Sequence, residues 1–166
     1  AWVSYAPQCA MTGHTLDVWS TSPDDEWRLT PERLRTYLGD DIATPRLLIL
    51  NAPCNPTGAV YRRSHLRALA EILRTTNTIV VLDEIYADLH FGSEPHASLA
   101  EELPNRCIVT SGMSKAMAAG GYRLGYALFP PELASLCRAT IALASETYSC
   151  APSPMQYALC DVLRHH

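Results

Sequence analysis

Three short apolar runs constrain the fold of this chain more than any other feature of its sequence. They are RLLIL at 46–50, TIVVL at 78–82 and RCIVT at 106–110, and apolar and polar residues do not alternate in them. Strands with one face in water alternate, whereas strands covered on both faces are apolar along their length. The runs therefore predict a mostly parallel sheet with helices on both faces.

Segments with helical periodicity lie before, between and after these runs. The clearest is predicted at 64–74 with Ser64 as its N-cap, because apolar residues recur there with the spacing of one helix face. Pro31 and Pro131 each begin a further helix, and residues 154–164 form another. No Gly/Ser-rich linker or repeat divides the chain. The 166 residues are therefore expected to form one three-layer α/β/α unit.

Composition argues against several classes of function. The formal net charge of −4 lacks the basic excess that nucleic-acid binding requires. The longest apolar runs fall far short of the ~20 residues that span a bilayer, so no membrane partner is expected and the protein is interpreted as cytoplasmic. The six cysteines form no CxxC pair, and His90 and His96 lack the spacing of metal ligands. Neither a disulfide framework nor a metal site is predicted.

Polar side chains follow each of the three apolar runs. NAPCNPTG (51–58) comes after the first, DEIYADLHF (83–91) after the second, and SGMSKAMAAGGYRLGYA (111–127) after the third. Each stretch alone has a simpler explanation: a turn, a helix cap or solvated surface charges. Ligands of an open parallel sheet bind beyond the carboxyl ends of its strands, however, and all three stretches lie there. Their conjunction favours a ligand site.

Pyridoxal phosphate is a cofactor that uses this set of groups together. It requires a lysine amine for its Schiff base and a carboxylate that keeps its pyridine nitrogen protonated. It also requires hydrogen-bond donors near its 3-oxygen and cationic or hydroxyl groups at its phosphate. The three stretches supply an amine, a carboxylate, an amide, a phenol and a guanidinium.

NPTG, DEIY and GMSKAMAAGGYRLG also stand in the order and spacing of one protein family. The chain resembles the large domain of the fold-type I, class I/II pyridoxal-phosphate aminotransferases. The resemblance implies that Lys115 forms the Schiff base with the cofactor and moves the substrate proton. It further implies that Asp83 pairs with the pyridinium nitrogen, and that Tyr86 and Asn55 hydrogen-bond the 3-oxygen. In this family the Asn-Pro bond is cis, which is then expected of Asn55-Pro56.

The same resemblance also implies which residues contact the phosphate and the ring face of the cofactor. Arg123, whose planar fork suits bidentate contact, and Ser114 correspond to phosphate ligands. Many relatives have a hydroxyl three residues before the lysine, where this chain has Gly112, so Ser111 or Ser114 is expected to take that role. Trp2 corresponds to the aromatic that stacks on the cofactor ring, and an ordinary packed tryptophan is its simpler alternative.

The activity implied is exchange of an amino group between an amino acid and a 2-oxo acid through an internal aldimine on Lys115, in a homodimer. Another fold-type I activity (lyase, cyclopropane-forming synthase or oxidase) and a non-catalytic domain remain open. A Ser-Lys hydrolase fits poorly, because Gly112 stands where its serine would be. Residues 1–166 match neither the family's N-terminal segment nor its small domain. They are interpreted as a cofactor-binding large-domain fragment that is inactive alone.

Overall fold

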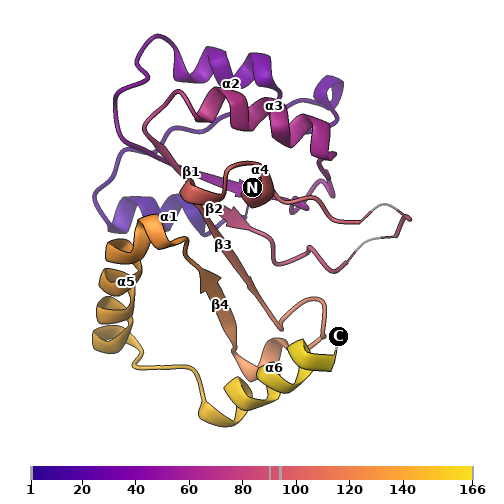
Figure 1. The fold of residues 1–166 in the computed structure, drawn as a ribbon, viewed down its shortest axis with the longest axis vertical. Helices are drawn as coiled ribbons and strands as arrows, with labels where there is room; N and C mark the ends of the chain where they lie inside the picture. Colours follow the sequence, from indigo (N-terminus) through magenta and orange to yellow (C-terminus); the bar gives the residue numbers. More distant parts are fainter. Residues whose placement is uncertain (1, 90, 94, 166) are drawn as a thin grey trace.

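Four strands form one sheet in the order β1-β2-β3-β4 (Figure 1), seen in a computed structural model that describes residues 2–89, 91–93 and 95–165. The strands are β1 (Arg46–Asn51), β2 (Thr78–Asp83), β3 (Cys107–Gly112) and β4 (Gly125–Leu128). The first three are parallel, and β4 runs antiparallel to β3. The α/β class and the mostly parallel sheet are thus confirmed, and the three apolar runs form its parallel strands.

The helices of the described residues include all those predicted. They are α1 (Tyr5–Met11), α2 (Pro31–Leu38), α3 (Arg63–Leu73), α4 (Leu99–Glu102), α5 (Ala134–Thr147) and α6 (Ser153–His165), with 3₁₀ turns η1 (Pro23–Asp25), η2 (Pro104–Arg106), η3 (Gly120–Tyr122) and η4 (Pro131–Leu133). Pro131 begins the 3₁₀ turn that leads into α5.

The predicted cap of α3 was wrong. The helix begins at Arg63, and the residue at its N-cap is Arg62, whose backbone is extended and whose side chain makes no cap hydrogen bond. The Leu66 N–H already donates to the Arg62 carbonyl, so Ser64 lies inside the first turn. Burial of the apolar face of α3 fixes where the helix begins, and this outweighs the local preference of serine for a cap.

One layer of helices covers one face of the sheet. Leucines of α2, α3 and α4 pack on Val80 and Leu82 of β2 in a single core cluster. The strand order runs in one direction from β1 to β3, and right-handed crossovers between parallel strands place successive connections on the same face. This handedness explains why α3 and α4, which make the two crossovers, lie together.

Side chains on the opposite face of β1 and β2 are partly exposed in the described residues. Leu47 is 60% exposed and Ile49 39% exposed, and the side chains of β2 alternate between buried and partly exposed. The apolar runs predicted cover on both faces. Within the part of the chain that the structure describes, the helices that make the crossovers lie on one face, and Tyr5 of α1 reaches Asp83 on the other. None of the helices in this part has both the length and the apolar character of a membrane-crossing segment.

Candidate cofactor site

Amide groups link the ends of β1 and β2. The Asn51 side-chain amide donates to the Asp83 carbonyl oxygen at 2.9 Å, and its oxygen accepts from the Asn55 N–H at 2.7 Å. The Asn55 side-chain amide in turn donates to the Tyr86 hydroxyl oxygen at 3.3 Å. Asn55 and Tyr86, which are 31 residues apart, therefore meet at the carboxyl edge of the sheet as the sequence predicted.

The segment after β1 is a closed turn. The Cys54 N–H donates to the Ala59 carbonyl at 3.0 Å, and the Gly58 N–H donates to the Cys54 carbonyl at 2.7 Å. The Asn55-Pro56 peptide bond is cis, which confirms the expectation, and Ala52-Pro53 is also cis. The proline-rich sequence thus turns the chain back on itself at the strand's end and presents Asn55 to Tyr86.

The carboxylate of Asp83 has two donors. The Ile85 N–H donates to Oδ1 at 3.3 Å, and the Tyr5 hydroxyl donates to Oδ2. Burial and the negative charge of Asp83 raise the pKa of Tyr5 far above its ordinary value, so the phenol stays protonated and remains a donor. Asp83 is therefore held in one orientation at the end of β2, and one of its two hydrogen bonds comes from α1, outside the sheet.

Tyr5 is a site residue that the sequence reasoning missed. It lies 78 residues from Asp83, and a tyrosine at the start of a helix gives no local sign of a carboxylate partner. The Trp2 and Tyr5 rings meet edge to face, with centroids 5.5 Å apart. Trp2, 46% exposed, is thereby linked through Tyr5 to Asp83.

Lys115 lies on a turn beyond β3. The turn is closed by hydrogen bonds from the Ala118 N–H to the Lys115 carbonyl and from the Ala119 N–H to the Met113 carbonyl. The side chains of Met113 and Ala119 anchor it in a second apolar cluster with Leu159 of α6. Lys115 itself is exposed, and its Nζ lies 5.9 Å from the centroid of the Tyr86 ring. The amine therefore stands beside the Asn55–Tyr86 pair.

Lys115 is the only lysine among the 166 residues, and the other 12 of the 13 basic Lys and Arg residues are arginines. An arginine guanidinium stays protonated near neutral pH and does not form a Schiff base, whereas a lysine amine can lose its proton. Among the side chains of these residues, Lys115 thus carries the one primary amine that can react with an aldehyde.

The residues predicted for the phosphate are less closely connected to this group. The Arg123 guanidinium donates to the Gly120 carbonyl at 2.7 Å and is exposed. The Ser111 hydroxyl donates to the Glu84 carbonyl at 3.3 Å. Ser114 is half-buried and makes no side-chain hydrogen bond within the described residues. A phosphate role for these three residues stays a prediction.

The glycine at position 112 has a steric cause. A Cβ added there would lie 2.8 Å from the Leu124 carbonyl oxygen and 2.9 Å from the Gly125 Cα, because β3 and β4 pair at this point. Both obstacles are backbone atoms. The chain therefore has no space for a serine three residues before Lys115, which explains its departure from the pattern expected there.

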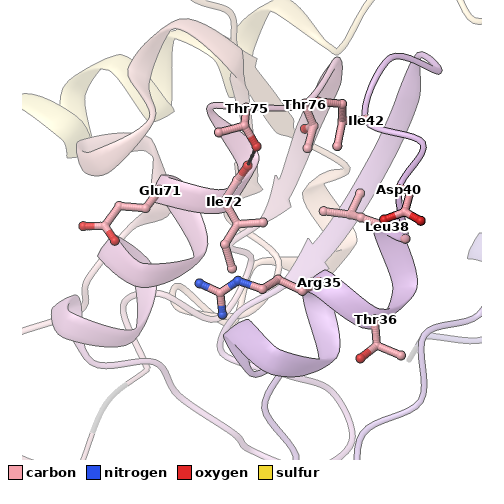
Figure 2. A pocket seen from close by; sticks show the side chains of 10 residues that line it. Arg35, Thr36, Leu38, Asp40, Ile42, Glu71, Ile72, Thr75 and Thr76 are labelled. Carbon is pink, nitrogen blue, oxygen red and sulfur yellow. Dashed lines mark hydrogen bonds between the residues drawn. The ribbon is translucent and has the colours of Figure 1, made fainter.

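A cleft of about 1400 Å³ opens beside Asn55 and Tyr86 and extends along the segment after β2 as far as His96 and the start of α3. A second hollow, a groove of about 530 Å³, lies between α2 and α3 (Figure 2). Figure 2 shows Arg35 of α2 and Ile72 of α3 at this groove. The groove is lined by none of the strand-end residues. Asn55 and Tyr86 line the cleft, whereas Asp83 and Lys115 lie outside its lining in the described part of the chain.

Comparisons with known proteins identify the family to which this chain belongs. The sequence matches the family "Aminotransferase class I and II" over residues 1–166. The chain belongs to the class I and II aminotransferases. It is 35% identical over 162 residues to the aspartate aminotransferase of Geobacillus stearothermophilus. Members of this family depend on pyridoxal phosphate.

Solved structures of other aminotransferases share the fold. A double mutant of Thermus thermophilus aspartate aminotransferase superimposes with a TM-score of 0.85 at 30% identity, over 95% of this chain. The aromatic aminotransferase of Pyrococcus horikoshii gives a TM-score of 0.83 at 32% identity, over 95% of this chain. The chain covers 39% of the Geobacillus protein, 40% of the Thermus chain and 41% of the Pyrococcus chain. It thus spans about two-fifths of their length.

Proposed function

We propose that the protein is a pyridoxal-phosphate-dependent aminotransferase whose cofactor is held by the strand-end residues of this chain. The observation that carries the proposal is the convergence of three strand ends on one edge. Asp83 is fixed by two donors, Asn55 donates to Tyr86, and the amine of Lys115 lies over the Tyr86 ring.

The chemistry of these residues fits the cofactor. Pyridoxal phosphate supplies an aldehyde that bonds amines and a pyridinium ring that accepts an electron pair. The Asp83 carboxylate would hold the ring nitrogen protonated, and the amide of Asn55 and the hydroxyl of Tyr86 would donate to the 3-oxygen. The Lys115 amine would hold the aldehyde and then carry a proton to and from the substrate's Cα.

The remaining cofactor contacts are also proposals. Arg123 and Ser114, with Ser111 as the alternative hydroxyl, would bind the phosphate. Trp2 would lie against the ring, where its contact with Tyr5 fixes the angle of the indole. Arg123 would need to exchange its present bond to the Gly120 carbonyl for one to the phosphate, which an exposed guanidinium can do without breaking buried contacts.

The proposed substrates are an amino acid and a 2-oxo acid, as in the reaction that gives the family its name. We further propose that the whole protein is a homodimer, as the family resemblance implies, and that it is cytoplasmic.

A half-reaction tests this function. The whole protein is loaded with pyridoxal phosphate, freed of excess cofactor and mixed with single amino acids. A transaminase converts its cofactor to pyridoxamine phosphate and releases one 2-oxo acid per site. Release of ammonia with unchanged cofactor would instead indicate a lyase and refute the proposal. The Lys115→Arg variant keeps the positive charge but should form no product, which makes it the matched control.

A further inference from the structure

The segment between β2 and α4 leaves the sheet at Glu84 and returns at Ser98, the N-cap of α4. It carries Tyr86 and forms one wall of the cleft. The side chain of Glu84 joins the two ends of the segment. The Ser98 hydroxyl donates to Glu84 Oε1 at 2.6 Å, and His96 Nε2 lies 3.4 Å from Glu84 Oε2.

Glu84 is a buried carboxylate, 7% exposed. Its N–H donates to the Thr110 carbonyl at 2.9 Å, and its carbonyl accepts from the Ala87 N–H at 2.9 Å and from the Ser111 hydroxyl at 3.3 Å. Burial, followed by the negative charge of Glu84, raises the pKa of the neighbouring Cys107 thiol to about 12. A buried acid is costly unless its oxygens are paired, and here the Ser98 hydroxyl pairs with one of them.

The cluster does not have the arrangement of a hydrolytic triad. The Ser98 hydroxyl donates to Glu84 and accepts from the Ala100 N–H as the cap of α4, so both of its functions are taken. His96 Nε2 is at ion-pair distance from Glu84 without the geometry of a hydrogen bond, and no bond joins His96 to Ser98 within the described residues. The group that accepts from Ser98 is the Glu84 carboxylate and not an imidazole, so the order of serine, histidine and acid in a triad is not formed.

We propose that Glu84 is a positioning residue for Tyr86. By accepting from Ser98, Glu84 closes the base of the segment beside His96. The hydrogen bond from the Ala87 N–H to the Glu84 carbonyl then fixes the backbone of Tyr86. The Asn55–Tyr86 bond is 3.3 Å long, near the outer limit of hydrogen bonding, so a small displacement of Tyr86 would break it. This inference rests on the proposed function.

The test compares Glu84→Ala, Glu84→Gln, Tyr86→Phe and the double variant Glu84→Ala/Tyr86→Phe in the whole protein loaded with pyridoxal phosphate. The readout is the apparent pKa of the bound cofactor, from its absorbance as a function of pH. A hydroxyl that donates to the 3-oxygen lowers this pKa, so Tyr86→Phe should raise it by about 0.5 to 1 pH unit.

If Glu84 positions Tyr86, Glu84→Ala raises the same pKa, and the double variant shifts it no further than Tyr86→Phe alone. Glu84→Gln, which can still accept from Ser98, shifts it less. A Glu84→Ala protein that is less stable but keeps the wild-type cofactor pKa would overturn the proposal. Ser98→Ala, which removes the donor to Glu84 Oε1, gives the same decision if Glu84→Ala does not fold. A folded wild-type protein that takes up no cofactor would refute the proposed function, and this inference would fall with it.

Discussion

Gly112 offers a prediction that does not depend on the cofactor. Replacement by serine would restore the hydroxyl expected three residues before Lys115, yet its Cβ would lie 2.8 Å from the Leu124 carbonyl oxygen and 2.9 Å from the Gly125 Cα. Ordinary contact begins at 3.4 Å, and both obstacles belong to the backbone of β4, which is paired with Gly112. The two strands must therefore move apart locally.

Overpacking of this kind costs about 1–3 kcal/mol, and two backbone clashes favour the upper part of that range. At about 2–4 °C per kcal/mol for a domain of this size, Gly112→Ala and Gly112→Ser should both lower the melting temperature of the cofactor-free protein by about 4 to 12 °C. Thermal unfolding followed by circular dichroism measures the change. Gly121→Ala is the matched control, since nothing lies within 4 Å of its added Cβ. Melting of Gly112→Ala within about 1 °C of the wild type would refute the steric argument.

Three further substitutions test the site and the core. Tyr5→Phe removes a donor to Asp83 and should lower kcat about ten-fold, whereas Tyr157→Phe, on an exposed tyrosine of α6, should leave kcat unchanged. Because the folded state raises the pKa of Tyr5 above 10.0, the wild type should lose stability relative to Tyr5→Phe as the pH rises beyond 10.0, in urea unfolding at stepped pH. Asp83→Asn should lower turnover far more than cofactor content, and equal losses of both would contradict its assignment. Leu69→Ala, at a 1% exposed core position, should destabilise by about 2–5 kcal/mol, against less than about 1 kcal/mol for Leu47→Ala, where the side chain is 60% exposed.

Much of the fold followed from local patterns in the sequence. The apolar runs became β1, β2 and β3, because a short apolar run bounded by turn residues is typical of a buried strand. The polar groups of Asn55, Tyr86 and Lys115 came together because parallel strands end at the same edge. The order of the strands and the antiparallel strand β4 were not predicted, because both depend on pairing between segments that are distant in the sequence.

Other features depended on contacts that no local pattern encodes. The partner of Tyr5 is 78 residues away, and the reason for Gly112 lies in the pairing of β3 with β4. The apolar character of Leu47 does not reveal whether a helix covers it, since the handedness of the crossovers decides which face α3 and α4 occupy. Sequence periodicity therefore predicted the strands, the helices and the sheet edge at which the site residues lie. The contacts that hold Asp83 and that exclude a side chain at position 112 could be found only in the folded structure.

Covalent labelling of Lys115 tests the central claim most directly. The whole protein is incubated with pyridoxal phosphate, reduced with borohydride, digested and analysed by mass spectrometry. Since Lys115 is the only lysine in these 166 residues, a pyridoxyl group on a lysine of this region has one possible position. The account predicts close to one label per chain on Lys115 and its loss in Lys115→Arg. A folded protein that carries no label at saturating cofactor, or carries it on another residue, would contradict the account.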